Sequence, residues 1–320
     1  MTGQLSLFDQ KPEPGGPQDD LVQPLEPIEL LKDRPDAKLP DLVPASASLE
    51  LNRHYETRAV HIGRILTTLS EKLANDETIT RDEIGQQLSM TRALTDGTMN
   101  VMRRMGMVDP KTRITPFGSL VLAHSPYLDD SGLLWLLHYL LASDAELVLW
   151  SNLFNAALHD REQVSIQEIT EFFRPLEGRW SEKTIKDKIP SEVNGIFKTY
   201  TEALFSRLTL VHKIDTGSYQ SFWNTGVIPP YIWLSIILAY RDRYYPGASA
   251  LEIPLIVRAS YSPGRILRQN EATVRRVLDE LHNAGLLTVE TRSGLDQVRF
   301  KREFTWLSAA ARHLRGEGEP

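Results

Sequence analysis

The chain has 320 residues, 41% of them hydrophobic, and a formal net charge of −6. Because it contains no cysteine, disulfides, thiolate catalysis and cysteine metal sites are excluded, and the composition fits the reducing cytoplasm. The most apolar run, from Tyr231 to Tyr240, has ten residues against the roughly 20 that a membrane-spanning helix needs, so we expect no membrane partner.

Residues 1–50 hold the whole net charge, since they contain ten acidic and four basic residues. This segment is also rich in proline, and it cannot bury enough apolar surface to offset the entropy of ordering it. We therefore expect a disordered acidic tail. The remaining 270 residues carry 32 charges of each sign, so the acidic total does not argue against a nucleic-acid partner for the folded part.

Near its start the tail carries the apolar peptide QLSLF, which includes Gln4, Leu5, Leu7 and Phe8. The peptide resembles the short motif with which bacterial replication and repair proteins bind the sliding clamp. That resemblance implies that Gln4 hydrogen-bonds at the rim of a pocket while the three apolar side chains fill it, with the flexible tail supplying reach. The alternatives are a chance apolar patch or a different partner.

Residues 51–125 show the element order of a winged helix-turn-helix. A first helix with apolar residues at helical spacing is followed by a short helix, for which Thr80 and Glu83 form a capping box. After a tight connection comes a longer helix, roughly residues 94–105, which places its three methionines on one face. A small hairpin is expected around residues 109–111. This order predicts an N-terminal winged-helix-like domain.

The middle of the chain, residues 126–246, is predicted to be a helical domain. It begins with two dense apolar runs, LLWLLHYLLAS and LVLWSNLFNAAL. Later amphipathic patterns predict separate helices over residues 181–189 and 192–208, and residues 210–214 and 221–222 are expected to pair as strands.

Residues 247–310 repeat the first pattern with more basic charge. Asn270 is a good N-cap for a helix whose arginines must point outward. Two alternating segments, Leu286–Thr291 and Gln297–Lys301, then predict a hairpin. We therefore expect a second winged-helix-like domain, followed by a flexible tail over residues 311–320.

Basic side chains in the two winged-helix-like domains are the candidate DNA contacts, because phosphate binding needs bases on an exposed face. Asp96 is an acid among the N-terminal candidates. The alternatives are solvated helix faces with pairs such as Arg275 to Asp279 and Arg276 to Glu280, or a protein-docking role. The candidate residues are Arg92, Arg103, Arg104, Arg265, Arg268, Arg275, Arg276 and Arg292.

Catalytic candidates are few. Asp129, Asp130 and His138 lie close together in the sequence, but the two aspartates fit an N-cap and first-turn acids of the following helix. His138 lies about two turns further on, which is awkward for a shared metal, so no metal site is assigned. The cofactor stays unassigned, with a divalent metal as the candidate if the protein is a nuclease. No phosphate-binding loop or nucleophile elbow is present in the sequence.

A family resemblance spans about residues 53–302. The run TPFGSLVLAHSPYLDDSGLLWLLHYLLAS, with IGQQLSMTRALTDGTMNVMRRMGMV before it and SPGRILRQNEATVRRVLDEL after it, is similar to a bacterial family of uncharacterised-domain proteins from phage-defence islands. Members resemble the B component of the single-stranded DNA phosphorothioation system, to which nicking is ascribed. Two departures are the acid Asp96, where the family usually has a base, and a loosely matching first helix.

We thus expect a fold that is mainly α with small β-hairpins, in which two winged helix-turn-helix-like modules flank a helical core. The expected function is DNA binding within a phosphorothioation and anti-phage system, alongside other proteins of that system, with nicking at the modification site implied by the resemblance. The alternative is a non-catalytic winged-helix adaptor or transcription regulator.

Overall fold

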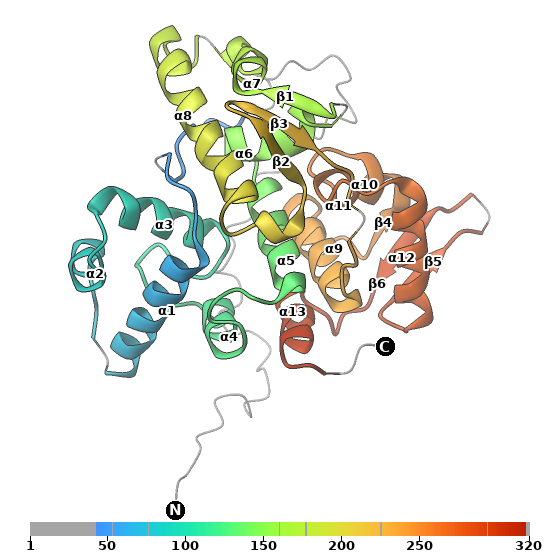
Figure 1. The fold of residues 1–320 in the computed structure, drawn as a ribbon. Helices are drawn as coiled ribbons and strands as arrows, with labels where there is room; N and C mark the ends of the chain where they lie inside the picture. The colour runs from blue at the N-terminus through green and yellow to red at the C-terminus, as the bar shows by residue number, and fades with distance from the viewer. Residues whose placement is uncertain are drawn as a thin grey trace, which may run out of the picture.

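The computed structural model describes residues 43–317, apart from the single positions Arg53, Asp76, Asp160, Glu177, Thr225 and Ser293. The fold is mainly helical with two small three-stranded antiparallel sheets, which confirms the predicted fold class. The N-terminal helices lie on one side of the molecule and the C-terminal helices and hairpin on the other (Figure 1). Between them run α5 (Ser131–Ala142) and α9 (Pro230–Tyr244), which pack against each other.

The N-terminal helices are α1 (Ala59–Ala74), α2 (Arg81–Leu88), α3 (Arg92–Arg104) and α4 (Pro116–His124). Thr80 and Glu83 form the predicted capping box at the start of α2, and the three methionines of and after α3 are fully buried. The predicted hairpin is reduced to one bridge between Val108 and Ile114. It ends early because the carboxylate of Asp109 accepts the Arg113 amide at 2.8 Å, and α4 begins directly afterwards.

Residues 43–57, which we name the strap, pack against the folded body. Our predicted tail ended at residue 50, but Val43 and Leu49 are buried, and Ser48 forms a parallel bridge with Leu147. The strap passes between α3 and α8 (Glu182–Thr201). A Cβ built on Gly97 of α3 would lie 2.7 Å from the Asn52 carbonyl oxygen, and one on Gly195 of α8 would lie 2.9 Å from that of His54. Glycine at both positions is what lets the strap approach so closely.

The middle of the chain forms helices around one small sheet, with strand order β1-β3-β2. Residues 182–201 are a single helix, α8, where we predicted a break at Pro190. Proline removes one helical hydrogen bond, but Ile185, Ile189 and Val193 are buried along one face, and this burial outweighs the loss. The remaining elements are α6 (Val148–Asn152), η4 (Leu153–Ala157), β1 (Gln163–Ser165), α7 (Ile166–Phe172), η5 (Arg174–Leu176), η6 (Ser206–Leu208), β2 (Val211–Asp215) and β3 (Ser218–Ser221).

The C-terminal part runs strand, helix, short helix, longer helix and hairpin, with sheet order β4-β6-β5. Asn270 caps the longer helix as predicted, by accepting the Thr273 amide at 2.8 Å. The last helix continues through Leu314, where we predicted a flexible tail from residue 311, because Ala309 and Ala310 are fully buried and the helix packs on α9. These elements are β4 (Ala250–Glu252), α10 (Ile253–Arg258), α11 (Pro263–Ile266), α12 (Glu271–Asn283), β5 (Leu287–Glu290), β6 (Gln297–Phe300) and α13 (Trp306–Leu314).

His138 is fully buried in the core, where it belongs to a linear series of hydrogen bonds. Its Nε2 is 3.1 Å from the Ile266 carbonyl oxygen, which can only accept, so Nε2 carries the proton. Its Nδ1 therefore accepts from the Tyr200 hydroxyl at 2.6 Å, and that oxygen accepts the Trp150 indole N–H at 3.0 Å. These hydrogen bonds join α5, α6, α8 and α11, and every polar group in the series is satisfied.

No helix in the described residues could cross a membrane, and the apolar run of α9 is buried here.

Candidate nucleic-acid interface

Two exposed basic side chains lie on α12 and on the loop of the hairpin that packs against it. Arg276 has 62% of its side chain exposed and pairs with Glu280 of the next turn, as the sequence indicated. Arg292 is exposed at the hairpin loop, and within the described residues no carboxylate lies within 4 Å of it. An exposed pair like Arg276–Glu280 contributes little to stability, so its arginine is free to exchange the carboxylate for a phosphate. We call Arg276 and Arg292 the α12 basic pair.

Other candidate bases of this region hold the fold together. Arg275 does not pair with Asp279; its guanidinium forms two hydrogen bonds to Asp296, at 2.9 and 2.7 Å, and a third to Glu271. These hydrogen bonds raise the pKa of Arg275 and fasten the hairpin loop to α12. Arg268 is buried, donates to the carbonyl oxygens of Phe222 and Leu158, and stacks on Trp223.

Arg265 is half-buried. One of its terminal nitrogens lies 3.4 Å from the Arg258 carbonyl oxygen. Neither Arg265 nor Arg268 is therefore presented on an open surface in the manner of Arg276.

The N-terminal candidates are spread over different environments. Arg92 is exposed at the start of α3, 3.6 Å from Asp82 and 3.9 Å from Asp96. Asp96 also lies 3.6 Å from Arg81, so this acid is compensated from two sides. The rest of α3 is covered along one face by the strap. Of α3 and α12, it is therefore α12 that keeps an open face.

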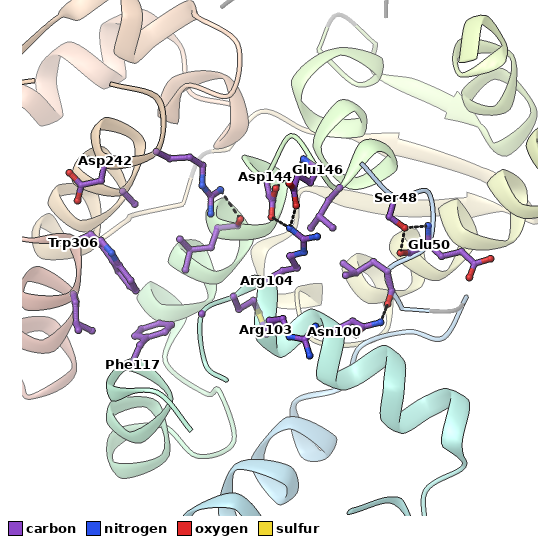
Figure 2. A pocket seen from close by; sticks show the side chains of 18 residues that line it. Ser48, Glu50, Asn100, Arg103, Arg104, Phe117, Asp144, Glu146, Asp242 and Trp306 are labelled. Carbon is purple, nitrogen blue, oxygen red and sulfur yellow. Dashed lines mark hydrogen bonds and ion pairs between the residues drawn. The ribbon is translucent and has the colours of Figure 1, made fainter. Parts of the chain in front are cut away.

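A cavity of about 450 Å³ lies where α3, α4, the α5–α6 connection, α9 and α13 meet. Figure 2 shows Trp306 and Phe117 at one side of it, Arg104 beside Asp144 and Glu146, and Arg103 below Arg104 in the view. Arg104 donates to both acids, at 3.2 and 2.6 Å.

Arg103 is half-buried at this cavity. Its Nε is buried and has no hydrogen-bond partner in the described residues. Burial, together with repulsion from Arg81 and Arg104, lowers the pKa of Arg103 below that of a free arginine.

Asp129, Asp130 and His138 are not brought together into one site. Asp130 caps α5 by accepting the Leu133 amide at 2.6 Å and also bonds His313 at 2.9 Å. Burial raises the pKa of Asp130, but these hydrogen bonds outweigh it and hold the pKa below the usual value. The side chain of Asp129 accepts from Ser125. His138 is fully buried, and burial lowers its pKa to about 4, so it stays neutral near pH 7.

Glu192 of α8 is a buried acid that the sequence analysis did not single out. Its carboxylate accepts the His54 amide at 2.7 Å and the Leu51 amide at 3.5 Å, so it holds the strap. Burial raises the pKa of Glu192 to about 7. The only sequence signal was an acid at the buried spacing of an amphipathic helix.

Within the described residues, no three histidine or acidic side chains gather closely enough to hold a metal ion. The peptide with Gln4, Leu5, Leu7 and Phe8 lies outside the described residues.

Comparisons with known proteins find a matching family and similar solved structures. Residues 97–313 match the family described as "Protein of unknown function (DUF4007)". The fold is similar to a structure titled "Magnesium ion-bound SspB crystal structure", with a TM-score of 0.66 at 15% identity over 89% of this chain and 90% of that one. A second, titled "SspB crystal structure", has a TM-score of 0.65 at 16% identity over 85% and 88%. No curated protein matches the sequence.

Proposed function

Because the chain belongs to the DUF4007 family, we propose that it is the DNA-binding component of a phosphorothioation-linked defence system in the cytoplasm, and that α12 docks on the DNA. The shared fold with SspB, a component of such a system, supports the proposal, together with the resemblance in the sequence. The observation that carries the DNA contact is the α12 basic pair, because Arg276 is exposed on α12 and Arg292 is exposed at the loop of the hairpin that packs on α12.

The chemistry of the contact is phosphate binding by guanidinium groups. Arg276 and Arg292 come from helix and hairpin loop, the two parts with which winged-helix modules reach a duplex. Arg275 supports them from behind, since its pairing with Asp296 fixes the loop relative to α12. Such contacts bind the backbone of any sequence and weaken as salt displaces them.

Charge-removing variants test the contact. The double variant Arg276→Gln with Arg292→Gln should lower affinity for a labelled duplex at least tenfold, measured by fluorescence anisotropy. Arg174→Gln is the matched control, because Arg174 is similarly exposed and paired to an acid but lies in the middle of the chain. Unchanged affinity of the double variant would remove α12 from the interface.

We also propose that the protein nicks DNA, and this part of the proposal rests on the family resemblance in the sequence. The described residues show no preformed group of three metal-ligating side chains. Supercoiled plasmid, purified protein and Mg²⁺ give the test. Conversion to open circles that the α12 double variant loses would support nicking by this protein.

A non-catalytic adaptor or transcription regulator is the second candidate. The observation that favours it is the structural use of the catalytic candidates, since His138 is sealed in the core and Asp130 caps a helix. Sequence-specific protection of DNA without any open circles in the same preparation would support the adaptor over the nickase.

The tail peptide is proposed to bind the sliding clamp. Changing Leu7 and Phe8 to alanine should abolish binding of the clamp in a surface plasmon resonance assay, because the apolar anchors are removed. The melting temperature should stay the same. A variant that binds as well as the original chain would refute the motif.

A further inference from the structure

We propose that the central cavity binds a nucleotide, with the base against Trp306 and the phosphate against Arg103. The ligand is a nucleoside monophosphate unit, either free or as one nucleotide of a DNA strand; in the second case the inference rests on the proposed function. At about 450 Å³ the cavity falls within the range of roughly 300–1,000 Å³ of small-molecule sites.

Within the described residues, two arginines at the cavity, Arg103 and Arg243, have no carboxylate within 4 Å. Among the acids, Glu50 pairs with Lys188 and Asp242 with Arg241. Asp144 and Glu146 share Arg104.

Among the other bases, Arg243 donates to the Leu140 carbonyl and to Ser143. Arg103 has no carboxylate within 4 Å in the described residues, and its buried Nε has no acceptor. An anion at the guanidinium of Arg103 would supply the missing counter-charge and relieve the repulsion from Arg81 and Arg104.

The opposite wall suits a planar ring. Trp306 and Phe117 meet edge to face, with centroids 5.1 Å apart. Phe117 is buried, whereas the indole of Trp306 keeps part of its surface exposed at the cavity (Figure 2). Aromatic faces like this one stack on nucleic-acid bases with little sequence preference.

The remaining polar groups favour a nucleotide over a fatty acid. Asp144 and Glu146 are acceptors at the cavity wall, and hydrogen bonds from Ser46 and Arg104 outweigh burial to hold the pKa of Glu146 below its usual value. They can accept from a sugar hydroxyl or an exocyclic amine. A hydrocarbon chain in the same space would leave them facing an apolar surface.

Calorimetric titration of the full chain with dAMP, AMP and inorganic phosphate tests the site. We expect a mononucleotide to bind, Arg103→Gln to weaken it tenfold or more, and Arg103→Lys to restore part of the affinity. Trp306→Leu should weaken the mononucleotide but not phosphate, and Trp306→Phe should restore it. Arg174→Gln is the control for charge, and melting temperatures identify any variant that fails to fold.

A duplex carrying one 2-aminopurine separates the two sources. A change in fluorescence that requires both Arg103 and Trp306, and that dAMP does not compete away, assigns the cavity to a nucleotide of DNA; competition by dAMP assigns it to free nucleotide. If neither mononucleotides nor the labelled duplex respond to Arg103→Gln, the inference is wrong. The α12 double variant distinguishes this from a failure of the proposed function, since it should lose duplex affinity and keep dAMP binding.

Discussion

Two buried residues show how single side chains tie distant segments of this chain together. His138 connects four helices through neutral hydrogen bonds, and its low pKa keeps it neutral. Glu192 holds the strap through two backbone amides, but it does so with a carboxylate that burial disfavours in its charged form. The two sites therefore differ in how they respond to pH.

The Glu192 carboxylate should make stability depend on pH. Its pKa rises from 4.5 to about 7 on folding, so the folded state binds the proton more tightly than the unfolded state. Its stabilising contribution to the free energy of unfolding is fully present below about pH 4.5. This contribution, on the order of 3 kcal/mol, is lost as the pH rises to about 7.

Glu192→Gln tests this dependence, because glutamine stays neutral and keeps a carbonyl oxygen for the His54 amide. The variant should gain stability relative to the original chain between about pH 5 and about pH 8, measured by urea unfolding at both values. Parallel pH profiles for the two proteins would contradict the assignment.

The arginines show what the sequence can predict about a site. Helical periodicity correctly placed Arg276 on the open face of α12 and its partner Glu280 one turn away. It could not show that Arg275 pairs with Asp296 across the hairpin, or that Arg268 turns inward to two carbonyls far away in the chain. Those partners are set by tertiary contacts, which local spacing does not encode.

At the scale of elements, the strap is the part that local patterns missed. Its segment reads as the end of an acidic tail, and only the assembled α3 and α8 give its apolar residues a place to bury. The capping box of α2, the α12 cap, and the pairing of β2 with β3 and of β5 with β6 follow from local chemistry and were predicted. The strand β1 and the unbroken α8 were not, because each depends on a distant partner.

The strap predicts an unusual response to alanine. In a helix, Gly→Ala ordinarily stabilises by about 0.5–1 kcal/mol. Gly97→Ala should instead destabilise by about 1–3 kcal/mol, because the new Cβ would lie within 3.2 Å of three Asn52 backbone atoms.

Thermal unfolding and limited proteolysis of the strap measure the Gly97→Ala effect. Lys183→Ala, an exposed site on α8, serves as the control. A stabilised Gly97→Ala protein would mean that the strap does not pack on α3.

At the scale of the whole molecule, N-terminal and C-terminal elements meet at the helical middle. The last helix, α13, packs on α4, α5 and α9, and the strap and α13 both line the central cavity. The predicted fold class held because both the helical and the hairpin periodicities are local. The cavity could not be predicted, since Trp306 is far in the sequence from Arg103 and Phe117 and meets them only in the fold.

The salt dependence of duplex binding tests the central claim most directly. For the full chain, the logarithm of the association constant should fall linearly with the logarithm of salt concentration between about 50 and about 200 mM. The α12 double variant should reduce that slope by roughly 2, about 0.9 for each phosphate that the variant no longer neutralises. No affinity for duplex at low salt, or the same slope in both proteins, would contradict the account.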